Sequence, residues 1–187
     1  MSSTTVTSSD PVLSLMAAAF ADTATMVESL SASDLDAATP CPGWDVAQVV
    51  EHIAGALEMF AAAIGDETPP GDPADPIHRV RPLTEAVAAG WAVPGRLDTP
   101  VDLPFGTFPA PLALRINVLE TFVHGLDLAA ATGRGSGVSA TRCDAVREMA
   151  EAAGFDAFRQ PGMFGAAVAP RDDSSFARLM AFVGRTI

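Results

Sequence analysis

The sequence is poor in positive charge. It contains no lysine, and its 11 basic side chains, all arginines, stand against 23 acidic ones, giving a formal net charge of −12 at pH 7. Nucleic acids and anionic membranes bind proteins through concentrated positive charge, and no segment of this chain clusters its arginines. The composition therefore indicates neither a nucleic-acid-binding nor a membrane-binding protein, and a small molecule is the expected partner.

Cysteine is also scarce, with only Cys41 and Cys143 in the chain. Two cysteines so far apart form neither a disulfide framework nor a Cys-x-x-Cys metal or redox motif. Cys41, which is flanked by two prolines, is interpreted as a thiol packed in a loop because free cysteines are mostly buried. A catalytic nucleophile is the alternative.

Long hydrophobic runs are missing as well. The alanine-rich runs at 16–20 and 61–63 are too short to cross a bilayer. Residues 1–10 are rich in serine and threonine and lack the basic start and apolar centre of a secretory signal. The expected location is therefore the cytoplasm.

The hydrophobic pattern predicts one helical domain over residues 1–187, with residues 1–9 flexible, because 49% of the residues are hydrophobic and most recur at helical spacing. Helices are predicted at 11–30, at 45–64, from Pro82 or Thr84 to 93, and at 110–132, 139–153 and 174–185. Residues 66–75 are predicted to be an exposed linker, and 101–106 an extended crossover rather than a strand of a sheet. The predicted fold class is all-α, a four-helix bundle with a long crossover connection plus short C-terminal helices.

The segment with the most chemical content lies in the fourth predicted helix. Glu120 and His124 are four residues apart, so on a helix they share one face. Together with Asp127 they flank the stripe predicted to face the core, namely Leu112, Ile116, Leu119, Val123, Leu126 and Ala130. Buried ionisable groups are costly unless they are paired or coordinate a metal.

His52 offers a third donor, because it borders the apolar face of the second predicted helix and a bundle can bring that face against the fourth. Two histidines and a carboxylate with an open position are typical of catalytic zinc sites, and they also suit iron or nickel. The residues alone leave an alternative open, in which the histidines are satisfied core residues and Glu120 hydrogen-bonds His124 on the helix surface. His78 has no partner at useful spacing and is predicted to lie on the surface.

Two separated motifs stand out in the chain. The first runs from Thr39-Pro40-Cys41-Pro42-Gly43-Trp44-Asp45 to Glu51-His52-Ile53, and the second is Glu120-x3-His124-Gly125-Leu126-Asp127-Leu128. Together they resemble the DinB-like superfamily, in particular actinobacterial metal-binding proteins related to mycothiol-dependent maleylpyruvate isomerase. The similarity extends over nearly the whole chain, including residues 103–106 and 179–185.

The resemblance implies that His52, Glu120 and His124 hold a divalent metal, with zinc as the first choice and nickel or iron as alternatives. Asp127 is implied to hydrogen-bond a ligand or to fix the helix. The implied cosubstrate is a low-molecular-weight thiol such as mycothiol, which the metal deprotonates for S-transfer to, or isomerisation of, a small electrophile. Maleylpyruvate isomerase itself has an additional C-terminal domain that these 187 residues lack, so that particular activity does not follow.

Other functional hypotheses stay open. The chain could be a metal- or small-molecule-binding module without turnover, or a cyclase or isomerase that uses the same bundle without a thiol. Pairing of two copies through an exposed apolar face also suits a helical bundle. The loop at 154–170 is predicted to pack on the core, with a lid over the site as the alternative.

Overall fold

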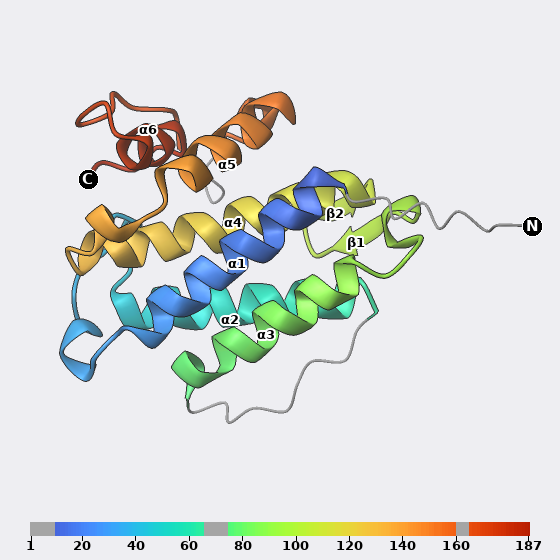
Figure 1. The fold of residues 1–187 in the computed structure, drawn as a ribbon, viewed down its shortest axis with the longest axis horizontal. Helices are drawn as coiled ribbons and strands as arrows, with labels where there is room; N and C mark the ends of the chain where they lie inside the picture. Colours follow the sequence, from blue (N-terminus) through green and yellow to red (C-terminus); the bar gives the residue numbers. More distant parts are fainter. Residues whose placement is uncertain (1–9, 66–74, 160–164) are drawn as a thin grey trace, which may run out of the picture.

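The structure, a computed structural model, describes residues 10–65, 75–159 and 165–187 (Figure 1). Within these ranges it is mostly helical, which confirms the predicted all-α character. The elements are α1 (Pro11–Glu28), α2 (Val46–Ala63), α3 (Pro76–Trp91), β1 (Val101–Leu103), β2 (Gly106–Phe108), α4 (Ala110–Ala131), α5 (Ala140–Ala152) and α6 (Ser175–Phe182). The predicted flexible start at 1–9 and all of the predicted linker except Asp75 lie outside the described residues.

Side-chain caps fix the starts of the first two helices where the sequence predicts them. Asp10 accepts a hydrogen bond from the Val12 amide at 2.9 Å, and Pro11 occupies the first helical position. Asp45 and Gln48 form a capping box at the start of α2, with side-chain-to-backbone distances of 2.8 and 3.0 Å.

The predicted start of α3 is wrong, because the helix begins at Pro76 rather than at Pro82 or Thr84. Asp75 caps it by accepting from the His78 amide at 3.3 Å, and the ring of Pro76 suits the first turn. Pro82 lies inside the helix, where a proline normally weakens it by removing a hydrogen bond. His78 is exposed as predicted, but it has a partner, since its Nδ1 lies 2.7 Å from Asp75 Oδ2.

Residues 101–108 form a β-hairpin, so the predicted extended crossover is wrong in detail. β1 and β2 pair antiparallel, with Val101 opposite Phe108. The Thr107 hydroxyl donates to Asp102 Oδ1 at 2.6 Å across the pair. Pro104, which argued against a strand, lies in the turn, where its missing N–H removes no hydrogen bond from the ladder.

Helix α4 runs through the middle of the packed elements. α1 and α2 each contact both α3 and α4, while α5 and α6 pack on each other and on α4, near the C-terminus (Figure 1). Between 117 and 129 every residue of α4 except Glu120 is buried. The predicted one-sided stripe is therefore wrong in part, since Leu112, Ile116 and Ala130 are only half-buried. Because α4 is covered on nearly all sides, its buried residues are not confined to one face.

Among the described residues, α2 is long and apolar enough to cross a membrane by length and composition. Half of it is buried inside the structure, and the core helix of a globular protein passes the same test.

Gly125 of α4 packs closely against Thr23 of α1. A Cβ at this position would lie 2.7 Å from Thr23 Oγ1, which donates to the Thr121 carbonyl at 3.2 Å. We expect Gly125→Ala to lower the free energy of unfolding by about 1–3 kcal/mol through overpacking, as measured by urea denaturation. Gly55→Ala is the matched control, because nothing lies within 4 Å of its added methyl and a helical alanine is favoured over glycine. Equal losses in the two variants would contradict the close packing.

Candidate functional site

The structure brings together the three side chains that the sequence singles out. His52 comes from α2, and Glu120 and His124 come from successive turns of α4. Glu120 Oε1 lies 2.5 Å from His52 Nε2 and 3.3 Å from His124 Nε2. Both imidazoles therefore turn the same nitrogen toward one carboxylate oxygen.

The Trp44 indole forms one wall of this cluster. Its ring centroid lies 4.6 Å from that of His52, edge-on, and 5.9 Å from that of His124, with the planes 24° apart. The loop before α2 holds Trp44 in place through hydrogen bonds between Thr39 and Trp44, from the Thr39 amide at 3.0 Å and its hydroxyl at 2.9 Å to the Trp44 carbonyl. The Gly-Trp motif thus places an aromatic ring against both histidines.

The charges of the cluster are strongly coupled. Burial would raise the pKa of Glu120, but the imidazolium of His124 and hydrogen bonds from His124 and His52 outweigh it and hold this pKa well below its usual range. Burial would lower the pKa of His124, but the carboxylates of Glu120 and Asp127 raise it to about 9. In the metal-free protein, a proton on His124 therefore balances the buried negative charge at neutral pH.

Asp127 lies directly behind His124. Its Oδ2 is 3.0 Å from His124 Nδ1, and its side chain is fully buried. The two groups are close enough to pair, but Nδ1 has no well-aligned hydrogen-bond partner. The structure thus places Asp127 where a carboxylate sets the orientation of a ligating histidine.

These residues fit a divalent metal. One donor atom from each of His52, Glu120 and His124 can be chosen so that all three lie within 4.8 Å of one another. Two imidazoles and a carboxylate are the donor set of catalytic zinc sites. The side chains of His52 and Glu120 are 34% and 35% exposed, so one side of the cluster faces solvent. That side offers room for a further ligand.

Two neighbours of the cluster, Cys41 and Arg185, are not part of the predicted site. The Arg185 guanidinium contacts Asp127 and also lies 3.4 Å from Cys41 Sγ. Cys41, His124 and Asp127 form a second group of donor atoms within 4.8 Å of one another. Cys41 belongs to the Thr39–Asp45 motif that leads into His52, so the sequence could have pointed to it. Arg185 is 58 positions from Asp127, and no motif in the sequence connects the two.

The two thiols differ in exposure, which leads to a labelling prediction. Burial raises the pKa of both, and that of Cys143 reaches about 12. Cys41 is half-buried, whereas Cys143 is fully buried. We expect iodoacetamide to label Cys41 in the folded protein more slowly than it labels free cysteine, and Cys143 only after unfolding, as read by peptide mass spectrometry. Labelling of Cys143 first would contradict its placement.

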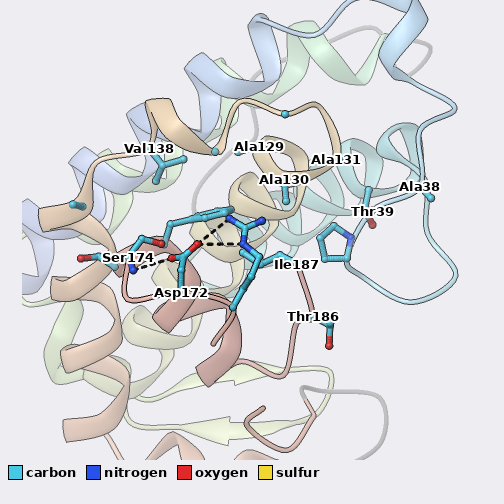
Figure 2. A pocket seen from close by; sticks show the side chains of 17 residues that line it. Ala38, Thr39, Ala129, Ala130, Ala131, Val138, Asp172, Ser174, Thr186 and Ile187 are labelled. Carbon is cyan, nitrogen blue, oxygen red and sulfur yellow. Dashed lines mark hydrogen bonds and ion pairs between the residues drawn. The ribbon is translucent and has the colours of Figure 1, made fainter. Parts of the chain in front are cut away.

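A cleft of about 820 Å³ lies at the C-terminal end of α4 (Figure 2). Its walls include residues 38–40, 129–131, 171–172 and 186–187. At its rim Arg171 pairs with Asp172 at 3.1 Å, and Asp172 accepts from the Ser174 amide at 2.9 Å. The cleft has the size of a small-molecule site. Its lining residues are sequence neighbours of Cys41, Asp127 and Arg185, but they do not include His52, Glu120 or His124.

The segment suggested as a lid has two described parts, at 154–159 and 165–170. In the first part Phe155 is buried, and the ring of Phe158 lies 5.5 Å from that of Phe155 and 6.3 Å from that of Phe108 in the hairpin. The second part is exposed, with the Val168 amide donating to the Ala181 carbonyl at 3.0 Å and the backbone of Gly165 and Ala166 beside Gly184. Met163 and Phe164, which the lid hypothesis also uses, lie outside the described residues.

Comparison with known proteins agrees with the two motifs. The family described as "Mycothiol maleylpyruvate isomerase N-terminal domain" matches residues 16–129, more than half of the chain. Two proteins of Mycobacterium tuberculosis, from strains CDC 1551 / Oshkosh and ATCC 25618 / H37Rv, are both described as uncharacterized. Each is 30% identical to the chain over 170 residues, which cover 88% of this chain and 92% of the relative. No solved structure matches significantly. The resemblance inferred from the motifs is confirmed, and the chain belongs to the family of the mycothiol maleylpyruvate isomerase N-terminal domain, a DinB-like family.

Proposed function

We propose that this chain is a divalent-metal-dependent enzyme that uses a low-molecular-weight thiol, such as mycothiol, for S-transfer to or isomerisation of a small electrophile. The observation that carries the proposal is the convergence of His52, Glu120 and His124, whose donor atoms lie within 4.8 Å of one another with one side open to solvent. Membership of a family named after a mycothiol-dependent isomerase supports the thiol.

The residues of the cluster have separate roles in this proposal. His52 and His124 offer their Nε2 atoms and Glu120 offers Oε1 to the cation, for which zinc is the first choice and nickel or iron the alternatives. A bound divalent metal lowers the pKa of a coordinated thiol, so that a thiolate exists near neutral pH. Asp127 orients His124 from behind, and Trp44 shields one side of the cluster from water.

The proposal includes a fold, a cellular location and a class of partner, all taken from the family resemblance and the composition. The helices α1 to α4 form a four-helix bundle of the DinB-like type, with the connection from α3 to α4 as its crossover. The protein acts in the cytoplasm on a small molecule, and its net charge of −12 disfavours nucleic acid and anionic membrane as partners.

Metal analysis tests the first half of the proposal. Protein purified without a histidine tag should contain close to one divalent metal ion per chain, or take up one Zn²⁺ from a buffered solution. His52→Ala and His124→Ala should each lose it. A wild-type protein that neither contains nor binds metal would refute the site.

Thiol consumption tests the second half. The zinc-loaded protein is incubated with mycothiol and an electrophilic probe such as monochlorobimane, and the loss of free thiol is followed. Loss that depends on metal and on His124 supports the enzyme. Metal binding without thiol loss favours a binding module, and conversion of a substrate without thiol favours a thiol-independent cyclase or isomerase.

A further inference from the structure

We infer that Arg185 is a positioning residue for the proposed metal site: through Asp127 it holds His124 in the orientation in which Nε2 faces the cation. This inference rests on the proposed function, and it adds a residue from the C-terminal segment, outside the region that the family match covers.

Arg185 reaches the site because of the way α6 ends. The chain leaves α6 through Gly184, whose φ of +81° suits glycine. The Arg185 amide donates to the Met180 carbonyl at 2.8 Å, and the Gly184 amide to the Ala181 carbonyl at 3.1 Å. These two bonds form a Schellman motif, which reverses the chain direction at a fixed angle. The local sequence thus directs the Arg185 side chain toward α4.

The Arg185 guanidinium pairs with the buried carboxylate of Asp127. Arg185 Nε donates to Asp127 Oδ1 at 3.1 Å, and Nη2 lies 3.3 Å from Oδ2. The Asp127 side chain is fully buried and that of Arg185 is 10% exposed, so this pair is shielded from solvent. A buried carboxylate left without its partner is strongly unfavourable, so the side chain moves when the partner is removed.

The other side of Asp127 faces His124. The same Oδ2 that Arg185 contacts lies 3.0 Å from His124 Nδ1. An Asp127 side chain fixed by Arg185 limits the movement of the His124 ring beside it, so that Nε2 stays turned toward Glu120 and His52. Arg185 Nη2 also contacts Cys41 Sγ at 3.4 Å, so one guanidinium connects the α6 end, α4 and the loop that carries Trp44.

The two possible roles of Arg185, as a nearby positive charge or as a positioning residue, predict opposite changes in cation affinity when it is removed. This difference makes the inference testable. If Arg185 acted only as a nearby positive charge, removing it would strengthen the binding of a cation. If it holds Asp127 and His124 in place, removing it weakens binding, in line with the roughly 10–100-fold cost of losing a residue that supports a metal ligand.

The experiment measures Zn²⁺ affinity by competition with a chromophoric chelator for wild type, Arg185→Met and Arg185→Lys. Co²⁺ absorption spectra report the coordination geometry of each protein. We expect Arg185→Met to bind Zn²⁺ about 10-fold or more weakly, with a changed Co²⁺ spectrum. Arg185→Lys keeps the charge and should recover part of the affinity, and it remains available if the methionine variant does not fold.

Arg142→Met is the matched control. Arg142 also makes a two-bond pair with a carboxylate, that of Asp22, at 2.6 and 3.2 Å; this pair connects α5 to α1 and is more exposed than the Arg185 pair. It should keep wild-type affinity and spectrum. Equal or tighter Zn²⁺ binding by the folded Arg185 variants overturns the inference alone, whereas absence of Zn²⁺ binding by wild type overturns the proposed function together with it.

Discussion

Glu120→Gln should weaken Zn²⁺ binding by about a hundredfold or more while leaving the fold intact. The substitution keeps the shape of the side chain and removes the charge on which both imidazoles converge, at 2.5 Å from His52 and 3.3 Å from His124. Because Glu120 would bind the metal directly, its loss should cost at least the roughly 10–100-fold in affinity that losing a residue supporting a metal ligand costs. Competition with a chelator of known Zn²⁺ affinity measures the difference.

Glu51→Gln controls for the loss of one negative charge. Glu51 precedes His52 in α2, but its side chain is 60% exposed and its Oε1 lies 3.8 Å from Arg79 Nη1. Screened surface pairs contribute little, so this variant should bind Zn²⁺ within about threefold of wild type. A similar loss in both variants would show that net charge, rather than the geometry around Glu120, controls binding.

The helices were predictable wherever local signals specify them. Asp10 and Asp45 cap α1 and α2 as expected, because capping depends on residues within one turn. The start of α3 was not predicted, because Pro82 suggests a helix start, whereas the helix continues N-terminal to it as far as Pro76. The hairpin was missed for a similar reason, since prolines flank a pairing that only the antiparallel partner strand reveals.

The clustered donors and Asp127 were predictable from the sequence, but the contribution of Arg185 was not. Glu120 and His124 share a helix face, so their spacing is informative, and His52 borders the apolar face of its own helix, a position that the family motif also includes. The pairing of Asp127 with Arg185 joins residues 58 positions apart, and it depends on how α6 packs on α4. The hydrophobic pattern of the sequence does not indicate such a contact, and the family match, which ends at residue 129, does not reach Arg185.

The pH dependence of Zn²⁺ binding should show the proton that the metal displaces. In the metal-free protein the carboxylates of Glu120 and Asp127 outweigh burial and raise the pKa of His124 to about 9. Zn²⁺ binds the neutral imidazole, so below that pH a proton must leave. The apparent affinity should therefore rise about tenfold per pH unit, or roughly 30-fold from pH 7 to 8.5. Chelator competition corrected for the chelator's own protonation measures this slope, and a flat profile would contradict it.

The same proton should have the opposite effect on the stability of the metal-free protein. The pKa of His124 is about 9 when folded and near 6.5 in the unfolded chain, so the stabilisation is complete below pH 6.5 and is lost as the pH rises through 9. Urea denaturation of the metal-free protein should thus give falling midpoints from pH 6.5 to 9. Saturating Zn²⁺ should flatten that trend, because its binding tightens over the same range by as much as the stabilisation from the proton is lost. His124→Ala should remove this contribution to the metal-free slope, and an unchanged slope would place the titrating group elsewhere.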